Sequence, residues 1–135
     1  MSEDHPTTYY EKELKRIRSD IYSNQGQLDT VIGTRKYIDN HYDTELNLDL
    51  LAQNQFVSKY HLLRLFKRYY GLTPRQYLMD KRIEKSKECL TSGMTVTETC
   101  FAVGFESLGS FSNLFKNKTG KAPAQFQKEQ LSRSK

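Results

Sequence analysis

The chain has 135 residues and a mass of 15.8 kDa, which is enough for one domain and too short for two domains with separate cores. Its hydrophobic share is 36% and its charged share 27%, and sixteen Phe and Tyr residues argue against disorder along the whole chain. The net charge of +5 is unevenly spread: six Lys or Arg against ten Asp or Glu give −4 over residues 1–50, and fifteen against six give +9 over residues 51–135, which favours a polyanionic partner such as nucleic acid or an anionic membrane surface.

Two helices are predicted in the N-terminal part of the chain, after a polar segment at residues 1–7. The first begins at Thr8 and is expected to end near Gly26, in the polar stretch 24–26. The second is predicted from Leu28 to about Tyr42, before another polar stretch. The first helix is amphipathic, with charged residues on one face and an apolar stripe on the other, formed by Tyr10, Leu14, Ile17 and Ile21.

The middle of the chain predicts two shorter helices and one long helix. Asn47 and Ser58 are suitable N-caps for helices at residues 48–55 and from 59 onward. Gly71 is expected to end the second of these, and Thr73 and Pro74 then start a helix that runs to about residue 90. The predicted inner faces are Leu48, Leu51 and Ala52, then Leu62, Leu65, Phe66 and Tyr69, and in the long helix Tyr77, Leu78, Ile83, Ser86 and Leu90.

The C-terminal part predicts the same order of elements again. Thr95 caps a short helix at residues 96–103, Gly104 makes a turn, and Ser107 caps a helix that Gly120 ends. Pro123 starts a last helix that reaches about residue 131. No segment alternates polar and apolar residues as a half-buried strand does. The sequence therefore predicts an all-α fold of seven or eight helices.

Neither a disulfide framework nor a membrane segment is expected. Cys89 and Cys100 occupy apolar positions of helical patterns, and one pair in such a chain predicts two reduced core residues. No apolar stretch approaches the roughly 18 residues that span a bilayer. The N-terminus also lacks the basic and apolar segments of a secretion signal. We therefore expect a cytoplasmic protein.

An internal duplication covers residues 58–77, which recur 49 residues later as residues 107–126. The matched positions are the serine caps, a Leu-Phe-Lys run, a glycine, a proline and a glutamine. These are residues expected in caps and cores, whereas the positions that differ lie on the opposite helix face. The matched pairs are Ser58 and Ser107, Leu65-Phe66-Lys67 and Leu114-Phe115-Lys116, Gly71 and Gly120, Pro74 and Pro123, and Gln76 and Gln125.

Each copy predicts a helix-turn-helix, in which a short first helix positions a capped second helix for a DNA major groove about 12 Å wide. Arg64 suits the O6 and N7 acceptors of guanine, and Asn113, at the matching position, suits adenine. A single basic helix face is more often simply solvated, but two copies favour DNA binding. The outer faces are Lys59, Tyr60, Leu63, Arg64, Lys67 and Arg68 in the first copy and Leu108, Gly109, Ser112, Asn113, Lys116 and Asn117 in the second.

The same two helices supply the predicted phosphate contacts. Lys67 and Lys116 follow the Leu-Phe pairs, and the caps Ser58 and Ser107 leave backbone N–H groups free to face the DNA backbone. The full predicted set is Ser58, Lys59, Lys67, Arg68, Ser107, Lys116 and Lys118. The long helix of about 17 residues measures roughly 25 Å, and the two outer helices lie farther apart, near the roughly 34 Å of one B-DNA turn. One chain could therefore occupy two successive major grooves without a partner subunit.

The second copy contains Val103-Gly-Phe-Glu-Ser107, Phe111, Phe115-Lys116, Gly120 and Pro123. Through these residues the chain resembles the AraC/XylS family of bacterial transcription regulators, over roughly residues 28–130. The resemblance implies two helix-turn-helix units of homeodomain-like form joined by a long helix, and transcriptional activation through RNA polymerase. It places the base-contacting positions at Tyr60, Leu63, Arg64, Gly109, Ser110 and Asn113.

The resemblance also suggests a division of the chain. Residues 1–27 form an N-terminal tail and amphipathic helix, and residues 28–131 form the DNA-binding domain. Within that domain the first helix-turn-helix covers about 47–71 and the linker helix 74–91. The second helix-turn-helix covers about 95–120 and the C-terminal helix 123–131.

Several positions depart from the family pattern, and three of them have an expected consequence. Phe56 stands where the family has Gly or Asn, and it predicts a locally different first turn because a bulky residue disfavours positive φ. Gly109 removes a side chain at a base-contacting position and lowers helix propensity by about 1 kcal/mol. Gln127 replaces the Arg that would supply a phosphate or structural contact from the last helix.

The alternatives to a DNA-binding regulator have less support in the sequence. His5, His41 and His61 are isolated, neither cysteine has a nearby histidine, and no Gly-rich phosphate loop is present. No enzyme, cofactor, metal site or ligand pocket is therefore expected. The main competing interpretation is an all-helical module that binds a protein, since a fold does not fix its function.

The apolar stripe of the N-terminal helix leaves three possibilities open. Our first expectation is that it packs on the DNA-binding domain. The second is self-association. The third is that the chain is the DNA-binding fragment of a larger effector- or signal-responsive regulator.

Overall fold

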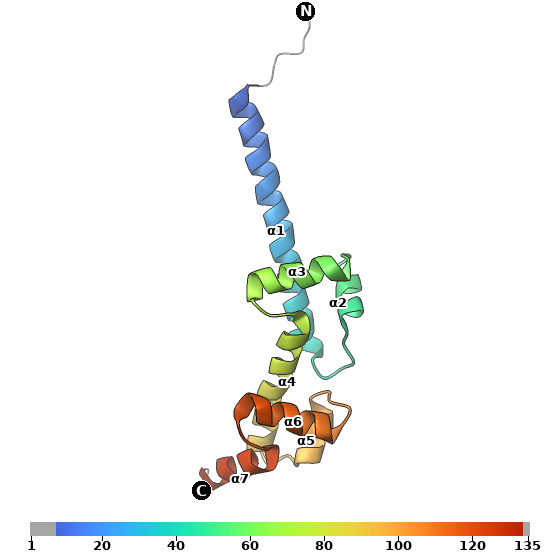
Figure 1. The fold of residues 1–135 in the computed structure, drawn as a ribbon, viewed down its shortest axis with the longest axis vertical. Helices are drawn as coiled ribbons and strands as arrows, with labels where there is room; N and C mark the ends of the chain where they lie inside the picture. The colour runs from blue at the N-terminus through green and yellow to red at the C-terminus, as the bar shows by residue number, and fades with distance from the viewer. Residues whose placement is uncertain (1–7, 134–135) are drawn as a thin grey trace, which may run out of the picture.

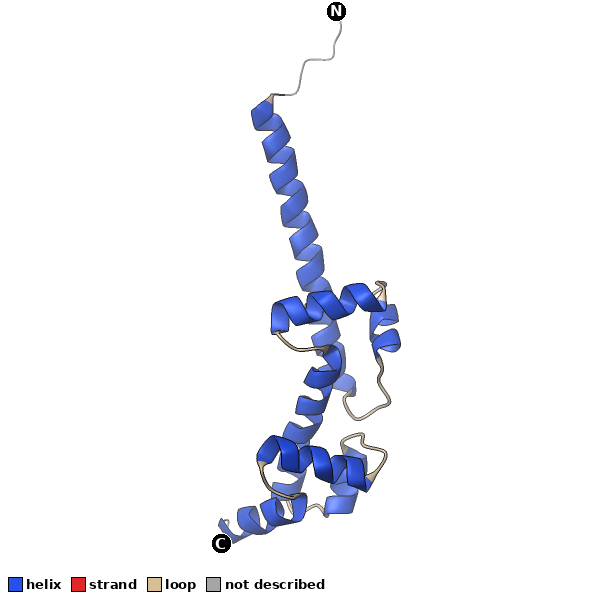
Figure 2. Ribbon diagram, viewed as in Figure 1, coloured by secondary structure: helices blue, strands red, loops and turns tan. Residues whose placement is uncertain are grey.

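The computed structural model describes residues 8–133, apart from the side chain of Tyr22, and contains helices but no strand within that range (Figures 1 and 2). Two helix-turn-helix units, α2–α3 and α5–α6, are joined by α4. The predicted all-α class and its division into two units are confirmed. The helices are α1 (Tyr9–His41), α2 (Leu48–Asn54), α3 (Lys59–Tyr70), α4 (Pro74–Thr91), α5 (Val96–Ala102), α6 (Leu108–Thr119) and α7 (Pro123–Arg133).

The first helix is continuous, so the break predicted near Gly26 is wrong. Local side-chain bonds span the predicted break: Gln25 Nε2 donates to Asp29 Oδ1 at 3.0 Å, and the Thr30 hydroxyl donates to the Gly26 carbonyl at 3.0 Å. A glycine inside a helix costs only about 1 kcal/mol relative to alanine. The favourable residues on either side therefore carry the helix through this point, and α1 reaches 33 residues.

The predicted caps are confirmed in both units. The Ser58 hydroxyl accepts from the His61 N–H at 3.1 Å, and the Ser107 hydroxyl accepts from the Ser110 N–H at 3.2 Å. The C-caps of α3 and α6 are Gly71 and Gly120, with φ of 74° and 83°. These local devices fix the length and direction of α3 and α6, which are the helices predicted to contact DNA.

Each unit has its own core, and α4 contributes to both. The core of the first unit also includes the C-terminal half of α1, whereas that of the second includes α7 through Phe126. The linker helix is therefore a rigid part of both units rather than a flexible tether. The buried residues are Val31, Ile38, Leu51, Ala52, Leu62, Leu65, Phe66 and Leu78 in the first unit, and Ile83, Leu90, Cys100, Val103, Phe105, Phe111 and Phe115 in the second.

Two expectations about the inner faces are wrong. Tyr69 was predicted inside but is 38% exposed, and the Tyr70 ring packs instead against Phe66, with centroids 4.8 Å apart. The N-terminal half of α1 was expected to pack on the domain, but its stripe is exposed, and Figure 1 shows this half standing clear of the other helices.

Both cysteines are free thiols, as predicted. Cys100 is buried, which raises the pKa of its thiol, and Cys89 is half-buried against the same core. Within residues 8–133, no helix combines the length and the apolar character required to cross a bilayer.

Candidate nucleic-acid interface

The two candidate recognition helices have the same orientation in the molecule. In Figure 1, α3 and α6 both cross the axis formed by α1 and α4, and both run from their serine caps toward their glycine caps in nearly the same direction. The short helices α2 and α5 lie beside the N-terminal ends of α3 and α6. The duplicated sequence therefore forms a duplicated arrangement, with equivalent helix faces available twice.

The turn between α2 and α3 has the same hydrogen bonds as the turn between α5 and α6. The N–H of Val57 donates to the Ala52 carbonyl at 3.1 Å, and that of Phe105 donates to the Cys100 carbonyl at 3.0 Å. Phe56 takes a φ of 58° where Gly104 takes 103°. The expectation that Phe56 would avoid positive φ is therefore wrong, although residues 55–58 separate α2 from α3 where the longer segment 103–107 separates α5 from α6. Its ring is 95% exposed, so its bulk meets no neighbour, and the helices on both sides hold the left-handed backbone.

Replacing Phe56 with glycine is expected to raise the free energy of unfolding by about 0.5–1 kcal/mol. The left-handed conformation costs an L-residue roughly 1–2 kcal/mol, and the greater entropy of glycine in the unfolded chain offsets part of the gain. Urea unfolding followed by circular dichroism would measure the change. Phe56→Ala is the matched control, because alanine keeps the strained conformation; an equal gain in that variant would assign the effect to the exposed ring.

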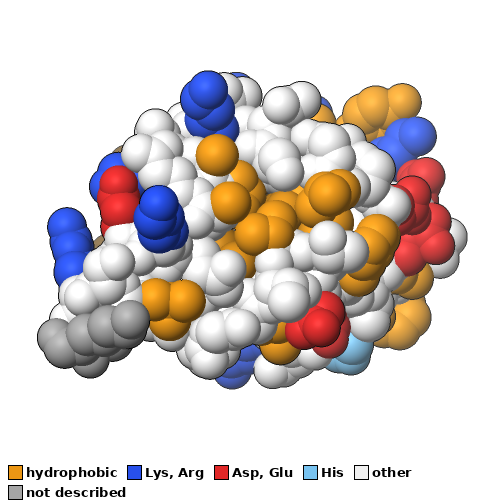
Figure 3. Space-filling model, turned by 90° about the horizontal axis from the view of Figure 1, so that it is seen from below, with side chains coloured by type: hydrophobic (Ala, Val, Ile, Leu, Met, Phe, Trp, Pro, Cys, Tyr) orange, Lys and Arg blue, Asp and Glu red, His pale blue; other side chains and the backbone are white. Residues whose placement is uncertain are grey.

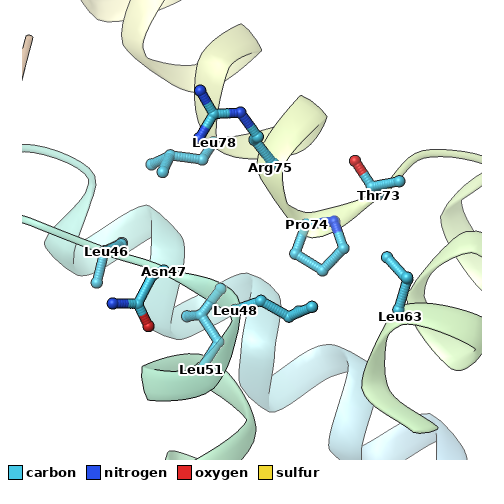
Figure 4. A pocket seen from close by; sticks show the side chains of 9 residues that line it. All are labelled: Leu46, Asn47, Leu48, Leu51, Leu63, Thr73, Pro74, Arg75 and Leu78. Atoms are coloured by element: carbon cyan, nitrogen blue, oxygen red, sulfur yellow. The ribbon is translucent and has the colours of Figure 1, made fainter. Parts of the chain in front are cut away.

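The outer face of α3 combines exposed polar residues with one partly covered leucine. Tyr60 is 67% exposed and Arg64 is exposed, as expected for side chains that reach base edges. Leu63, predicted to point outward, is half-buried at the edge of a pocket of about 370 Å³, where it faces Pro74 of α4 (Figure 4). The rest of the lining is Leu46, Asn47, Leu48, Leu51, Thr73, Arg75 and Leu78.

The outer face of α6 is smaller and less basic. Gly109, Ser110 and Asn113 are all exposed, and no atom lies within 4 Å of the position that a Gly109 Cβ would occupy. The Ser107 hydroxyl donates to the Ser110 hydroxyl at 2.8 Å, so Ser110 is tied to the cap. Of the three predicted base-contacting residues of α6, Gly109 has no side chain and Ser110 is bonded to the cap. Asn113 is therefore the one whose exposed amide group is available to contact a base.

The predicted phosphate contacts fall into two groups. Lys67 and Lys116 are exposed on the outer faces. Lys59 is also on this face, although its Nζ lies 3.8 Å from Asp49 Oδ1. Arg68 and Lys118 instead face other helices: Arg68 lines a depression with residues of α1, and Lys118 Nζ is 2.6 Å from Asp80 Oδ1 of α4. The two groups thus differ in how freely they can reach a phosphate.

Arg75 is a candidate contact that the sequence analysis missed. It is exposed near the start of α4 and lines both the pocket beside Leu63 and the depression beside Ser107 and Ser110. It therefore lies between the two recognition helices. The internal repeat did not point to Arg75, since the matching position in the second copy is Ala124. Only its position directly after Pro74, at the start of the linker helix, could have placed Arg75 on the surface between the two units.

Arg82 joins the two units. Its side chain is 6% exposed, and it donates from Nε to the Tyr42 carbonyl at 2.7 Å and from an NH2 group to the Thr44 carbonyl at 2.8 Å. Its guanidinium also lies 5.6 Å from the centroid of the Phe105 ring, in the turn of the second unit. Burial lowers the pKa of Arg82, yet an arginine remains charged in any folded protein. One side chain of α4 therefore contacts the end of α1 and the α5–α6 turn together.

Gln127 has a structural position in the second unit. Its Nε2 donates to the Leu90 carbonyl at 3.1 Å and to the Met94 carbonyl at 2.6 Å. It thus binds one carbonyl in the last turn of α4 and one in the segment that follows α4, and it fixes α7 against both. The residue that replaces the expected arginine therefore provides a structural contact without a charge. Among residues 8–133, no group of three His, Cys, Asp or Glu side chains is placed to hold a metal ion.

Comparison with known proteins finds a matching family model and similar proteins. A family model described as a helix-turn-helix domain matches residues 51–129. An HTH-type transcriptional regulator of Pseudoalteromonas carrageenovora is 35% identical over 92 residues, which are 68% of this chain and 55% of that protein. The bifunctional transcriptional activator and DNA repair enzyme AdaA of Bacillus subtilis is 34% identical over 92 residues, which are 67% of this chain and 44% of AdaA. The chain thus spans about half the length of these relatives.

The fold matches a structure solved with DNA. The DNA-binding domain of AdpA, a global transcriptional factor in complex with a target DNA, superposes with a TM-score of 0.74, over 78% of this chain and 96% of that chain. The sequences are 24% identical, so the likeness establishes the arrangement of the helices.

Proposed function

This chain belongs to the AraC-type family of helix-turn-helix transcriptional regulators, and we propose that it binds double-stranded DNA by placing α3 and α6 in successive major grooves. The observation that carries the proposal is the duplicated helix face, which has one orientation and two different sets of exposed side chains. The 18 residues of α4 span about 27 Å, which is compatible with the roughly 34 Å between grooves on one side of the duplex.

The two recognition helices are proposed to contact different base sequences. In the first unit Tyr60 and Arg64 contact base edges, and Arg64 selects guanine through two donors. Leu63, being half-buried, offers an apolar edge to a thymine methyl group. In the second unit Asn113 selects adenine, while Gly109 and Ser110 allow close approach of the α6 backbone. The binding site is therefore asymmetric.

The proposed phosphate contacts surround these base contacts. Lys67 and Lys116 contact the DNA backbone beside each groove, with Lys59 and the N–H groups capped by Ser58 and Ser107. Arg75 contacts the phosphates between the two grooves, because it lies between the two recognition helices. Lys118 and Arg68 contribute less, since each already faces another helix.

Selection of binding sites from randomised DNA is the direct test. The expected result is two different half-motifs whose centres lie about one helical turn, roughly 10 bp, apart. A G-containing half-motif would correspond to the first unit and an A-containing one to the second. Recovery of a symmetric motif, or no enrichment over random DNA, would contradict the proposed arrangement.

A salt titration separates DNA binding from the alternative of a helical module that binds protein. If several lysines and arginines displace counterions from DNA, the logarithm of the affinity must fall linearly with the logarithm of salt concentration. The expected slope corresponds to about five to seven phosphates, with roughly 0.9 per contact on B-DNA. A flat dependence would favour a protein partner.

Replacing Arg64 with alanine is expected to weaken binding to the selected site by about 1–3 kcal/mol and to relax preference at one base pair. Fluorescence anisotropy on the selected site and on single-base variants would measure both effects. Lys116→Ala and Arg75→Ala are the comparison variants, since loss of a phosphate contact should weaken selected and random DNA alike. Equal loss on every sequence for Arg64→Ala would reassign Arg64 to phosphate binding.

Activation of transcription through RNA polymerase is a further part of the proposal. AarP of Providencia stuartii, 32% identical over 65% of this chain, is an HTH-type transcriptional activator, and regulators predominate among the relatives even though AdaA is also a repair enzyme. Figure 3 shows hydrophobic side chains reaching the surface at the end of the molecule opposite the N-terminus. Phe101 of α5, 54% exposed, is a candidate contact. Action on chromosomal DNA would take place in the cytoplasm.

A further inference from the structure

The N-terminal half of α1 has an apolar stripe that no other described part of the chain covers. Tyr10 is 71% exposed, Leu14 44%, Ile17 47% and Ile21 60%. Single exposed hydrophobic residues are common on protein surfaces, but four in line along one free helix are a contact surface. In Figure 1 this part of α1 extends away from both helix-turn-helix units.

The spacing of the stripe is that of a coiled coil. The apolar residues alternate at intervals of four and three, which is a heptad repeat with an average period of 3.5 residues. Leu14, Ile21 and Leu28 occupy the a positions, and Tyr10, Ile17 and Asn24 occupy the d positions. A stripe limited to a and d is the narrow face of two paired helices, whereas a helix packed on a domain has a broader apolar face.

The charged residues beside the stripe favour a second copy of the same helix as the partner, in parallel orientation. Glu13 is at a g position and Arg18 at the following e position, and these two residues face each other across a parallel pair of identical helices. An antiparallel pair would bring g positions together, setting Glu13 against Asp20. Within one chain an Arg16 NH2 group lies 2.6 Å from Glu13 Oε2. In the pair Glu13 would therefore lie between Arg16 of its own helix and Arg18 of the second copy.

We propose that this surface pairs with a second copy of the chain in a parallel coiled coil. The paired segment covers about residues 9–24. Arg68 and Tyr69 of α3 line one depression with Ile21, Asn24, Gln25 and Leu28, so they restrict the stripe beyond that level, while Ile21 itself stays 60% exposed. Parallel pairing brings both DNA-binding domains to the same end of the coiled coil. The pairing does not depend on the proposed DNA binding, but on adjacent sites the two would strengthen each other through effective concentration.

Sedimentation equilibrium of the full chain, over a wide concentration range and without DNA, tests the pairing. A short coiled coil predicts a reversible monomer–dimer equilibrium. Ile17→Asp places a charge in the seam and is expected to raise the dimer dissociation constant by at least about tenfold. Ser19→Asp adds the same charge at an f position and should leave it unchanged. Because Ile17 and Ser19 are both exposed, thermal unfolding should confirm that the domain remains folded in each variant.

A monomer at every concentration would overturn the proposal, as would equal behaviour of the Ile17→Asp and Ser19→Asp variants. Binding of the monomer to anionic lipid vesicles, with loss of binding in Ile17→Asp, would assign the stripe to a membrane surface and also overturn it. The salt titration on DNA is unaffected by Ile17→Asp at a single site. Failure of the pairing is therefore distinguishable from failure of DNA binding.

Direction is tested by cross-linking and by charge exchange. Leu14→Cys should form an intermolecular disulfide under mild oxidation, since a residues meet their own copies in a parallel pair; the unmodified chain, with Cys100 buried and Cys89 half-buried, is the control. Glu13→Arg should weaken the dimer, and adding Arg18→Glu should restore it. No cross-link, or no restoration by the double variant, would contradict the parallel arrangement.

Discussion

Replacing Gly104 with alanine is expected to lower the free energy of unfolding by about 2–4 kcal/mol. Gly104 has a φ of 103°, which L-residues rarely adopt. A Cβ at this position would also lie 2.9 Å from the carbonyl oxygen of Tyr42 and 3.0 Å from Cζ of Arg82. The first neighbour is backbone at the end of α1, and the second is a buried side chain that is itself hydrogen-bonded. Neither can yield without opening the junction between the two units.

Gly120→Ala is the matched control for this prediction. Gly120 has a φ of 83°, but no atom lies within 4 Å of the position of its missing Cβ, so alanine there should cost only about 1 kcal/mol for the conformation. Urea unfolding of both variants, followed by circular dichroism, gives the comparison. Equal losses would mean that backbone conformation alone accounts for Gly104 and that the contact with α1 relaxes easily.

The parts of the fold that could be predicted from the sequence are those specified by local chemistry. Ser58, Ser107, Gly71 and Gly120 were placed correctly, because a hydroxyl that accepts from the first turn and a glycine that takes positive φ act within a few residues. The apolar spacing likewise identified both cores. The duplication then gave the two-unit arrangement, since one set of caps and core residues specifies one supersecondary unit each time it occurs.

The predictions that were wrong relied on the conformational preference of single residues, which neighbouring parts of the chain overrode. Phe56 takes the conformation that its side chain disfavours, because the neighbouring helices and the bonds of Ala52 fix the turn. Gly26 was expected to end a helix, but residues on both sides continue it. The free stripe of α1 was expected to find a cover within the chain, although its spacing already had the narrow period of a helix pair.

The tertiary contacts of the candidate site could not be predicted from residue types alone. Arg82 bonds to two backbone carbonyls about 40 residues away, and every residue has a carbonyl, so no pattern marks these acceptors. Lys118 is basic and near the predicted contacts, yet it pairs with Asp80 on α4. The assignment of individual residues to bases and phosphates stays a prediction, which rests on exposure and on place along α3 and α6.

Replacing Arg82 with methionine is expected to weaken binding to a complete two-part DNA site by about tenfold to a hundredfold, through loss of rigid coupling between the units. Methionine keeps an unbranched apolar side chain in place of the arginine stem, but it leaves the carbonyls of Tyr42 and Thr44 without their donors, at a cost in unfolding free energy of about 1–3 kcal/mol. The end of α1 is then no longer tied to α4 beside the turn of the second unit.

The spacing of the two half-sites distinguishes coupling from simple destabilisation. The unmodified chain should prefer one spacing sharply, because α4 and Arg82 hold α3 and α6 at a fixed separation. The Arg82→Met variant should lose affinity at that spacing, tolerate sites lengthened or shortened by one base pair, and bind isolated half-sites as before. Lys87→Met removes the same charge from an exposed position on α4 and should leave the spacing preference unchanged. If Arg82→Met instead weakens half-sites and complete sites equally, with the same spacing preference, Arg82 supports folding alone and the separation of the recognition helices is set by the shared core of α4.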